Sequence, residues 1–274
     1  MRASSEVVDS EAFPKSIIVH VGGVESFLGW AEHASTVSNV VIAPVELHRR
    51  NLKLRLTKAN LPLDAFAFTD PLAVASHVLE AAGKPTKALD RVDRLALLGD
   101  ILGGENEPTE RFRLVLGGEP AQSGNAIEQA RRELEVTTNY HPDRVRAFRQ
   151  VVESAPSPID VDVDDLLDGT LAGERALRRR SKKAPSDGEL VRRATRTITD
   201  TGGTAWNDAY LSVERIALVG LSTVPATLVD LLTAVTSQCD VEAHLILRRG
   251  TGLFLEQRLA DVWAVQNPGQ VVVT

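Results

Sequence analysis

Two segments, one near each end of the chain, each combine a short β-branched run with a small-residue turn and an amphipathic stretch. The first covers residues 16–31 (SIIVHVGGVESFLGWA) and the second covers residues 215–235 (RIALVGLSTVPATLVDLLTAV). α/β proteins build ligand sites at strand ends from such strand-turn-helix units. An alternating run at residues 241–247 follows the second segment and completes a β-α-β unit. The chain is therefore expected to form an α/β fold with a parallel sheet.

The turn of the first segment has part of the chemistry of a phosphate-binding loop. Such a loop needs converging glycines, a lysine for the outer phosphates and a hydroxyl for magnesium. Gly22, Gly23 and Ser26 supply the glycines and the hydroxyl, but no lysine precedes Ser26, and Glu25 places a negative charge where the phosphates would lie. We therefore expect a degenerate loop that hydrolyses no ATP, with Gly22, Gly23 and Ser26 as candidate nucleotide-binding residues. Alternatively, the glycines only permit close packing of strand and helix.

The second segment lacks the carboxylate that metal-assisted phosphoryl transfer needs at the end of a buried strand. Its strand, residues 216–219, leads into Gly220 with no Asp or Glu at its end. Ser222 or Thr223 is expected to cap the following helix, with Pro225 in its first turn. The six histidines show no metal-ligand spacing, so neither a catalytic residue nor a metal ligand is predicted.

Composition sets the outer limits of the interpretation. With 274 residues, 43% of them apolar, the chain can form one large domain or two small ones. No apolar run approaches the roughly 20 residues of a membrane span, and the N-terminus lacks a signal peptide's apolar region. We therefore expect a cytoplasmic protein without a membrane partner. The single cysteine, Cys239, excludes an internal disulfide framework, and no cofactor is expected.

The periodicity divides the chain into two α/β ends around a helical middle. Strands are expected at residues 39–43 and 65–69, and helices at 45–60 and 71–82. The helix at 45–60 is expected to carry basic side chains on its solvent side, namely His48, Arg49, Arg50, Lys53, Arg55 and Lys58. We predict a disordered segment at 1–14, a discontinuous α/β domain at 15–88 and 205–274, and a helical insertion at 89–204.

Three details of this organisation are specific enough to check. Asp70 and Asp90 stand where they can cap helices. The helix after Asp90 should turn Val92, Leu95, Leu98 and Leu102 inward. Residues 271–274 are expected to end the chain on a strand.

Charge is distributed unevenly along the chain. The net charge of −6 offers no global electrostatic case for nucleic-acid binding, yet residues 174–196 carry nine basic against three acidic residues, a local charge of +6. A run of this kind can contact a DNA backbone, although a charge run is more often a solvated face. The candidate DNA contacts are Arg178, Arg179, Arg180, Lys182 and Lys183, followed by Arg49, Arg50 and Lys53.

Several short segments resemble the N-terminal part of AddB-like proteins. They are residues 40–44 (VVIAP) before a basic helix, 66–73 (FAFTDPLA), 89–98 (LDRVDRLALL) and 216–225 (IALVGLSTVP). AddB-like proteins are the B subunits of helicase-nuclease complexes that process double-strand DNA breaks. The resemblance runs from Ser16 onward and implies a degenerate P-loop NTPase or helicase-like parallel sheet with an α-helical insertion. An active helicase would carry its magnesium-binding acid in the segment at 216–225.

The chain also departs from that family. The family's nuclease domain lies far beyond residue 274, and its iron-sulfur cysteines cannot be supplied by Cys239 alone. Nuclease activity is therefore not carried over, and a truncated or split relative is expected.

These observations predict a non-catalytic helicase-like subunit or fragment in DNA double-strand break repair or recombination. Its expected partners are DNA and a helicase or nuclease subunit. Two alternatives stay open: a nucleotide-binding regulatory protein with a degenerate phosphate loop, and a structural interaction module or truncated remnant.

Overall fold

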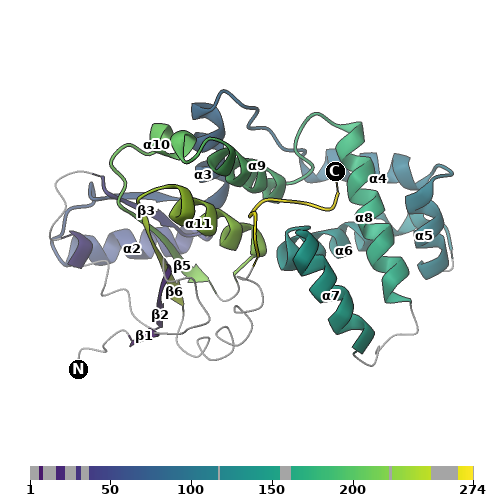
Figure 1. Cartoon of the computed structure of the whole chain (residues 1–274), viewed down its shortest axis with the longest axis horizontal. Coiled ribbons are helices and arrows are strands. Elements are labelled where there is room, and N and C mark those ends of the chain that lie inside the picture. The colour runs from purple at the N-terminus through teal and green to yellow at the C-terminus, as the bar shows by residue number, and fades with distance from the viewer. Residues whose placement is uncertain are drawn as a thin grey trace. The chain divides into compact units, whose positions relative to one another are not determined.

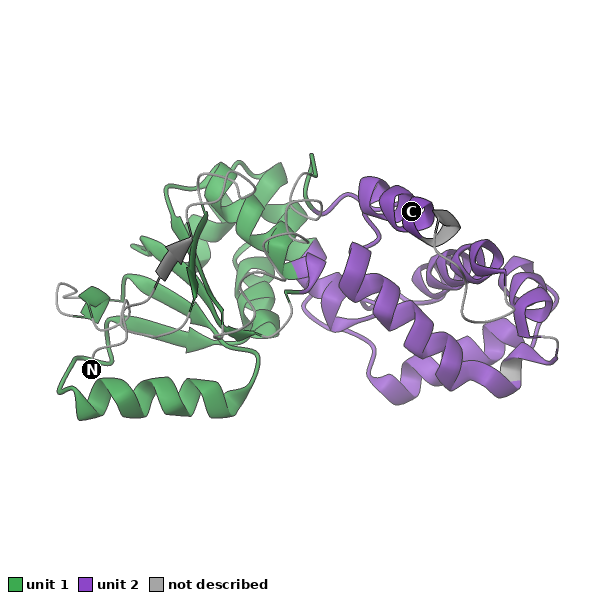
Figure 2. Ribbon diagram, turned by 90° about the horizontal axis from the view of Figure 1, so that it is seen from below, with its two compact units in different colours: residues 1–84, 193–224, 228–268 green, residues 85–192, 225–227, 269–274 purple. Residues whose placement is uncertain are grey.

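A computed structural model of the chain describes residues 6–8, 17–21, 29–31, 37–116, 118–154, 162–221, 224–247 and 265–273. The candidate phosphate-loop residues Gly22, Gly23 and Ser26 lie outside the described residues, as do the expected cap residues Ser222 and Thr223. The described residues divide into two compact units, coloured separately in Figure 2. The α/β unit comprises residues 1–84, 193–224 and 228–268, and the helical unit comprises residues 85–192, 225–227 and 269–274.

The α/β unit is built on a six-stranded sheet in the order β1-β2-β6-β5-β3-β4. Its strands are β1 (Glu6–Val8), β2 (Ile17–Val21), β3 (Asn39–Ile42), β4 (Phe66–Thr69), β5 (Arg215–Leu221) and β6 (Glu242–Leu247). β2, β6, β5, β3 and β4 pair in parallel, whereas β1, in the segment expected to be disordered, pairs antiparallel with β2. Parallel strands are covered on both faces, which is why all four residues of β3 are buried.

Helices cover the two faces of this sheet in a way that strand order dictates. α2 (Glu46–Lys58) connects β3 to β4 and α11 (Ala226–Gln238) connects β5 to β6, so the two crossovers run in opposite directions along the sheet. Because such crossovers are right-handed, the two helices fall on opposite faces, as Figure 1 shows. α2 buries Leu52 and Leu56 against Val41, Ala217 and Ile246.

Two of the remaining helices of the α/β unit pack on each other. α3 (Pro71–Ala81) contacts α10 (Thr204–Ala209), and the rings of Trp206 and Tyr210 lie 4.5 Å apart between centroids. The side chain of Asp70 accepts a hydrogen bond from the backbone N–H of Ala73, which confirms the expected cap of α3.

The helical unit contains α4 (Arg91–Leu102), α5 (Glu107–Leu116), the 3₁₀ helix η1 (Pro120–Ser123), α6 (Gly124–Thr138), α7 (Pro142–Ser154) and α8 (Val163–Arg180), and α9 (Asp187–Asp200) begins in it. Asp90 caps α4 through the N–H of Asp93, as expected, and Asp162 caps α8. The apolar core beneath α4, α5 and α8 is formed by Leu98, Ile101, Leu102, Phe112 and Leu177.

The structure differs from the sequence expectations at two places in this unit. Val92 is 76% exposed, because α4 turns only the face of Leu98, Ile101 and Leu102 inward. Residues 271–273 are not a strand. The N–H of Val272 instead donates to the carbonyl of Tyr140, and Val271 and Val273 are buried in a cluster with it. A short apolar run fits a buried strand or a buried irregular segment, so periodicity alone could not distinguish the two.

A buried ion-pair cluster joins four helices of this unit. Four arginines and four glutamates, contributed by α4, α6, α8 and α9, alternate in it. Its members are Arg94, Glu128, Arg131, Glu135, Glu174, Arg178, Glu189 and Arg192.

The contacts of the cluster close into a ring. Arg131 of α6 binds Glu174 of α8 at 2.8 Å, and Glu174 binds Arg178 at 2.9 Å. Arg178 binds Glu189 of α9 at 2.6 Å, and Glu189 also pairs with Arg192.

Glu135 completes the ring, since it lies 3.0 Å from Arg192 and 3.9 Å from Arg131. Gly188 lies so close to it that a Cβ there would be 2.8 Å from the Glu135 carboxyl, so glycine lets α9 approach α6.

Glu128 links this ring to α4, and its pKa reflects both burial and the neighbouring guanidinium groups. It lies 2.6 Å from Arg94 and 2.7 Å from Arg131. Burial alone would raise the pKa of Glu128, but hydrogen bonds from Arg131 and Arg94 and their charges outweigh burial and lower it. Glu128 therefore stays charged because two guanidinium groups bind it.

We expect Arg192→Ala to destabilise the helical unit by about 3–5 kcal/mol, because it removes a buried counter-charge that Glu135 and Glu189 share. Urea denaturation followed by circular dichroism measures the free energy of unfolding. The matched control is Arg50→Ala, which removes the exposed pair with Glu46 and should cost less than about 1 kcal/mol. Equal losses for the two variants would contradict a structural role for the cluster.

Candidate functional site

The carboxyl end of β5 is occupied by the imidazole of His48. Gly220 has a φ of +74°, at a register shift between β5 and β6, and a Cβ built on it would lie 2.4 Å from Nδ1 of His48. Any side chain at residue 220 would therefore collide with that ring. The expectation that His48 lines the solvent side of its helix was wrong, because α2 turns this half-buried residue toward β5.

This position is functionally informative because ligands bind parallel sheets at the carboxyl ends of strands. They bind in particular where successive crossovers leave on opposite faces. β3 and β5 are neighbours whose following helices, α2 and α11, cover opposite faces of the sheet. The strand end at which a metal-binding carboxylate would be most useful thus holds a glycine and a histidine ring.

A pair of histidines connects two strands of the same sheet. Nε2 of His20 on β2 lies 3.0 Å from Nδ1 of His244 on β6, and Nε2 of His244 lies 3.0 Å from the Glu242 carboxylate. The ring of Trp30 packs on His244 with centroids 4.5 Å apart, and both histidines are buried.

The direction of these hydrogen bonds follows from the carboxylate, which can only accept. Nε2 of His244 donates to Glu242, so Nδ1 of a neutral His244 accepts from Nε2–H of His20. Nδ1 of His20 is then an acceptor, buried and without a partner in the described part of the chain. This hydrogen bond requires a neutral His244, because a second proton on its Nδ1 would face the Nε2–H of His20. A second proton on His20 would lie on the buried Nδ1, where no described group accepts it.

The pKa of each histidine is lowered. For His20 the main cause is burial, followed by the charge of His244, and Glu242 opposes both. For His244 the main cause is again burial, with Glu242 raising the pKa and Arg215 lowering it. Arg215 also lies 3.3 Å from the Glu242 carboxylate.

The predicted basic contacts at the end of α8 separate into two kinds. Arg178 belongs to the buried cluster, and its side chain is only 16% exposed. Arg179, Arg180 and Lys182 are exposed, and within the described residues no carboxylate pairs with them. Lys183 is also exposed and lies 3.5 Å from Asp93.

The second predicted group, on α2, has its own contacts inside the α/β unit. Arg49 donates to the carbonyl of Ala43 at 2.7 Å and lies 3.6 Å from Asp70. Arg50 pairs with Glu46 at 2.7 Å, and the ammonium group of Lys53 lies 5.4 Å from the Phe68 ring centroid. The two predicted groups belong to different compact units.

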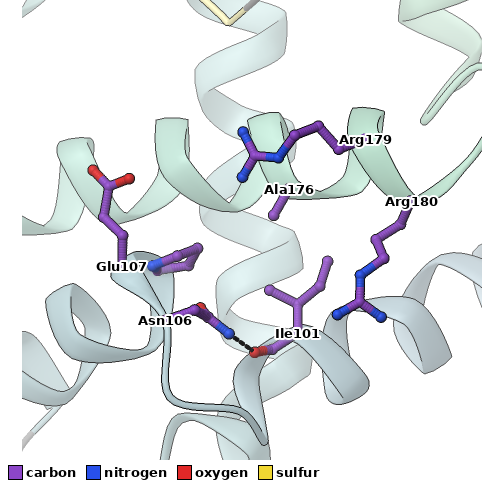
Figure 3. Close-up of a pocket in the computed structure, with 7 residues that line it drawn as sticks. Ile101, Asn106, Glu107, Ala176, Arg179 and Arg180 are labelled. Atoms are coloured by element: carbon purple, nitrogen blue, oxygen red, sulfur yellow. Dashed lines mark hydrogen bonds between the residues drawn. The ribbon is translucent and has the colours of Figure 1, made fainter.

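A pocket adjoins the end of α8, and sequence reasoning did not predict it. It has a volume of about 250 Å³ and lies between the C-terminal parts of α4 and α8 and the first turn of α5 (Figure 3). Arg179 and Arg180 line it together with Asn106 and Pro108. The run Asn106-Glu107-Pro108 is a helix-start signal that could have placed α5, but only tertiary packing brings it to α8.

A comparison with family sequence models finds a match over almost the whole chain. The model described as "Halobacterial UvrD-like protein" matches residues 3–274. The chain belongs to this halobacterial UvrD-like family. Membership confirms the expected helicase-like relationship and, with the parallel sheet, the expected helicase-like α/β fold with added helices. It does not single out the AddB-like proteins, and no curated protein matches the chain.

Two further observations concern the described residues of this UvrD-like protein. None of their helices is both long and apolar enough to cross a membrane. They also contain no group of three or more His, Cys, Asp and Glu side chains arranged to hold a metal ion.

The histidine pair predicts that stability falls in mild acid. The folded pKa values lie below the unfolded value of about 6.5, so the unfolded state binds more protons. The contribution is complete above pH 6.5 and is lost as the pH falls through the lower folded-state values. Unfolding free energies from pH 8 to pH 5 should show this decline.

The double variant His20→Phe/His244→Phe should flatten that decline, whereas His77→Gln, which changes an exposed histidine, should leave it unchanged. A wild-type profile that is flat across this range would contradict the neutral pair.

Gly220→Ala should destabilise the α/β unit by at least about 1–2 kcal/mol, from the positive φ alone, with the collision against His48 adding to it. The double variant Gly220→Ala/His48→Ala should recover the part due to the collision. Thermal denaturation of both variants measures these differences. Gly83→Ala is the matched control, since it also has a positive φ but no atom within 4 Å of its added Cβ.

Proposed function

We propose that this UvrD-like protein is a non-catalytic helicase-like subunit that contacts DNA and docks a helicase or nuclease partner in double-strand break repair or recombination. Family membership supports the helicase-like part. The exposed basic turn formed by Arg179, Arg180 and Lys182 is the observation that carries the DNA-contacting part.

The packing at Gly220 supports the absence of catalysis. Phosphoryl transfer needs a carboxylate to hold magnesium, and a P-loop helicase carries it at the end of a buried strand. At Gly220, next to the last residue of β5, the chain has no side chain to offer, and His48 occupies the space that one would need. A single substitution to Asp would therefore not restore a metal ligand in place.

The ion-pair cluster supports the choice of DNA contacts. The cluster neutralises Arg178, while Arg179, Arg180 and Lys182 carry three positive charges that no described carboxylate pairs with. A phosphate backbone supplies closely spaced negative charges, and binding it releases counterions. We place the α2 residues Arg49, Arg50 and Lys53 second because each already has a contact.

The role in double-strand break repair and the helicase or nuclease partner rest on the AddB-like segments. Copurification of the tagged full chain from its native cells tests this role and this partner. An ATPase subunit should be recovered with it, and recovery of the chain alone would contradict the docking role.

DNA binding is expected to weaken steeply with salt and to show little sequence preference. Fluorescence anisotropy with single-stranded and duplex oligonucleotides over a salt series measures both properties. The variant Arg179→Gln/Arg180→Gln/Lys182→Gln should bind more weakly, and its slope of log affinity against log salt for single strands should fall by about 2. Parallel assays with ATP and magnesium should show no hydrolysis.

The matched control is Arg91→Gln/Arg132→Gln/Lys87→Gln, which removes three exposed charges elsewhere in the helical unit. It should leave the affinity within about threefold of the wild type. Absent or salt-independent binding would overturn the DNA-contacting proposal, and hydrolysis would overturn the non-catalytic one.

A further inference from the structure

The pocket beside α8 has one apolar side and one cationic side. Ile101, Pro108 and Ala176 form the apolar side, and all three are buried. Arg179 and Arg180 form the cationic side, with Arg179 beside Ala176 and Arg180 reaching down toward Ile101 (Figure 3). A ligand that fits both sides needs an anionic group joined to an apolar face.

The polar groups among the other lining residues are already used by the fold. The side-chain N–H of Asn106 donates to the carbonyl of Ile101, as Figure 3 shows, and its oxygen accepts from the N–H of Thr109 at 3.2 Å. Asn106 thus holds the first turn of α5 against the end of α4.

The remaining acid of the pocket has its own counter-charge. Glu107 lies 3.5 Å from Arg175 of α8, which leaves Arg179 and Arg180 as the net charge of the pocket. The excess over this pair is two positive charges, which suits a phosphate.

We propose that this pocket binds one unpaired nucleotide of single-stranded DNA. The two guanidinium groups bind the phosphate, because their planar N–H donors match phosphate oxygens in pairs. The sugar and base lie on Ile101, Pro108 and Ala176. This inference rests on the proposed function and adds to it the form of DNA and the site that takes it.

The size of the pocket limits its occupant. At about 250 Å³ it is below the roughly 300–1,000 Å³ of common small-molecule sites, so it excludes a ligand longer than one nucleotide. A base within a duplex is stacked and paired and presents only its edge, so it cannot enter the pocket without being flipped out. The pocket therefore predicts a preference for single strands, which surface charge by itself does not provide.

The test uses the full chain, with 3′-fluorescein-labelled oligothymidine and a duplex of the same length, in fluorescence anisotropy titrations. Arg179→Lys/Arg180→Lys retains both charges but loses the paired donors. Binding to oligothymidine should weaken about tenfold, while binding to the duplex stays within about threefold. The matched control is Arg91→Lys/Arg132→Lys, which changes two exposed arginines outside the pocket and should alter neither affinity.

Ala176→Met fills the pocket without changing charge and should likewise weaken only the single-strand binding. Circular dichroism melting identifies any unfolding caused by this buried change. If Ala176→Met unfolds, the variant Arg179→Lys/Arg180→Lys, which changes exposed residues, decides whether the pocket binds single strands. Inorganic phosphate competing as well as thymidine 5′-monophosphate would show that the apolar side contributes nothing, which would overturn the nucleotide assignment.

The outcomes separate the two proposals. If the wild type binds neither DNA, both proposals fail. If it binds both forms with salt dependence, and neither the lysine variant nor Ala176→Met changes the preference, the DNA-contacting function stands and the nucleotide pocket is wrong.

Discussion

The buried ring of arginines and glutamates is the constraint on which the helical unit depends. Each of its charges would be expensive to bury alone, so α6, α8 and α9 must meet in the one arrangement that pairs them all. Tyr140 further restricts this arrangement, because its hydroxyl donates to the carbonyl of Arg131. Burial, followed by the charge of Glu174, raises the pKa of Tyr140. The apolar cores beside the ring tolerate repacking more readily, because they are not directional.

The ring also decides which positive charges of the unit remain available. Arg178, Arg179 and Arg180 follow one another in the last turn of α8, but successive helical residues point about a third of a turn or less apart. Arg178 faces α9 and is neutralised by Glu174 and Glu189, whereas its two neighbours face solvent and the pocket. One run of three identical residues therefore divides between stabilising the fold and presenting charge.

In the α/β unit the parallel sheet is buried on both faces, so any polar side chain in it needs a partner or a space that fits it. Three histidine rings pack in or against it through specific contacts. His20 and His244 bind each other, with Glu242 binding His244, and His48 of α2 occupies the space left by the missing side chain at Gly220. The Gly220 contact links shape and function. The residue that permits α2 to pack closely on the end of β5 also leaves that strand end without a carboxylate.

Much of this architecture was determined by the sequence alone, where local rules apply. Period-two and period-3.6 patterns predicted β3, β4, β5 and β6 and the helices α2, α3, α4 and α11, and Asp70 and Asp90 marked the starts of α3 and α4. The absence of an acid at Gly220 was likewise visible in the sequence. These features depend on residues a few positions apart, for which spacing is sufficient information.

Only the tertiary structure decided which charges pair and which surfaces form a pocket. Arg178 and Glu189 are 11 residues apart and Arg131 and Glu174 are 43 apart, so no local pattern distinguishes these arginines from the exposed Arg179. The same holds for His48 against Gly220 and for Ile101, Pro108 and Ala176, which three separate helices bring together. Such pairings follow from the burial of whole helix faces, and side-chain type and sequence spacing do not contain that information.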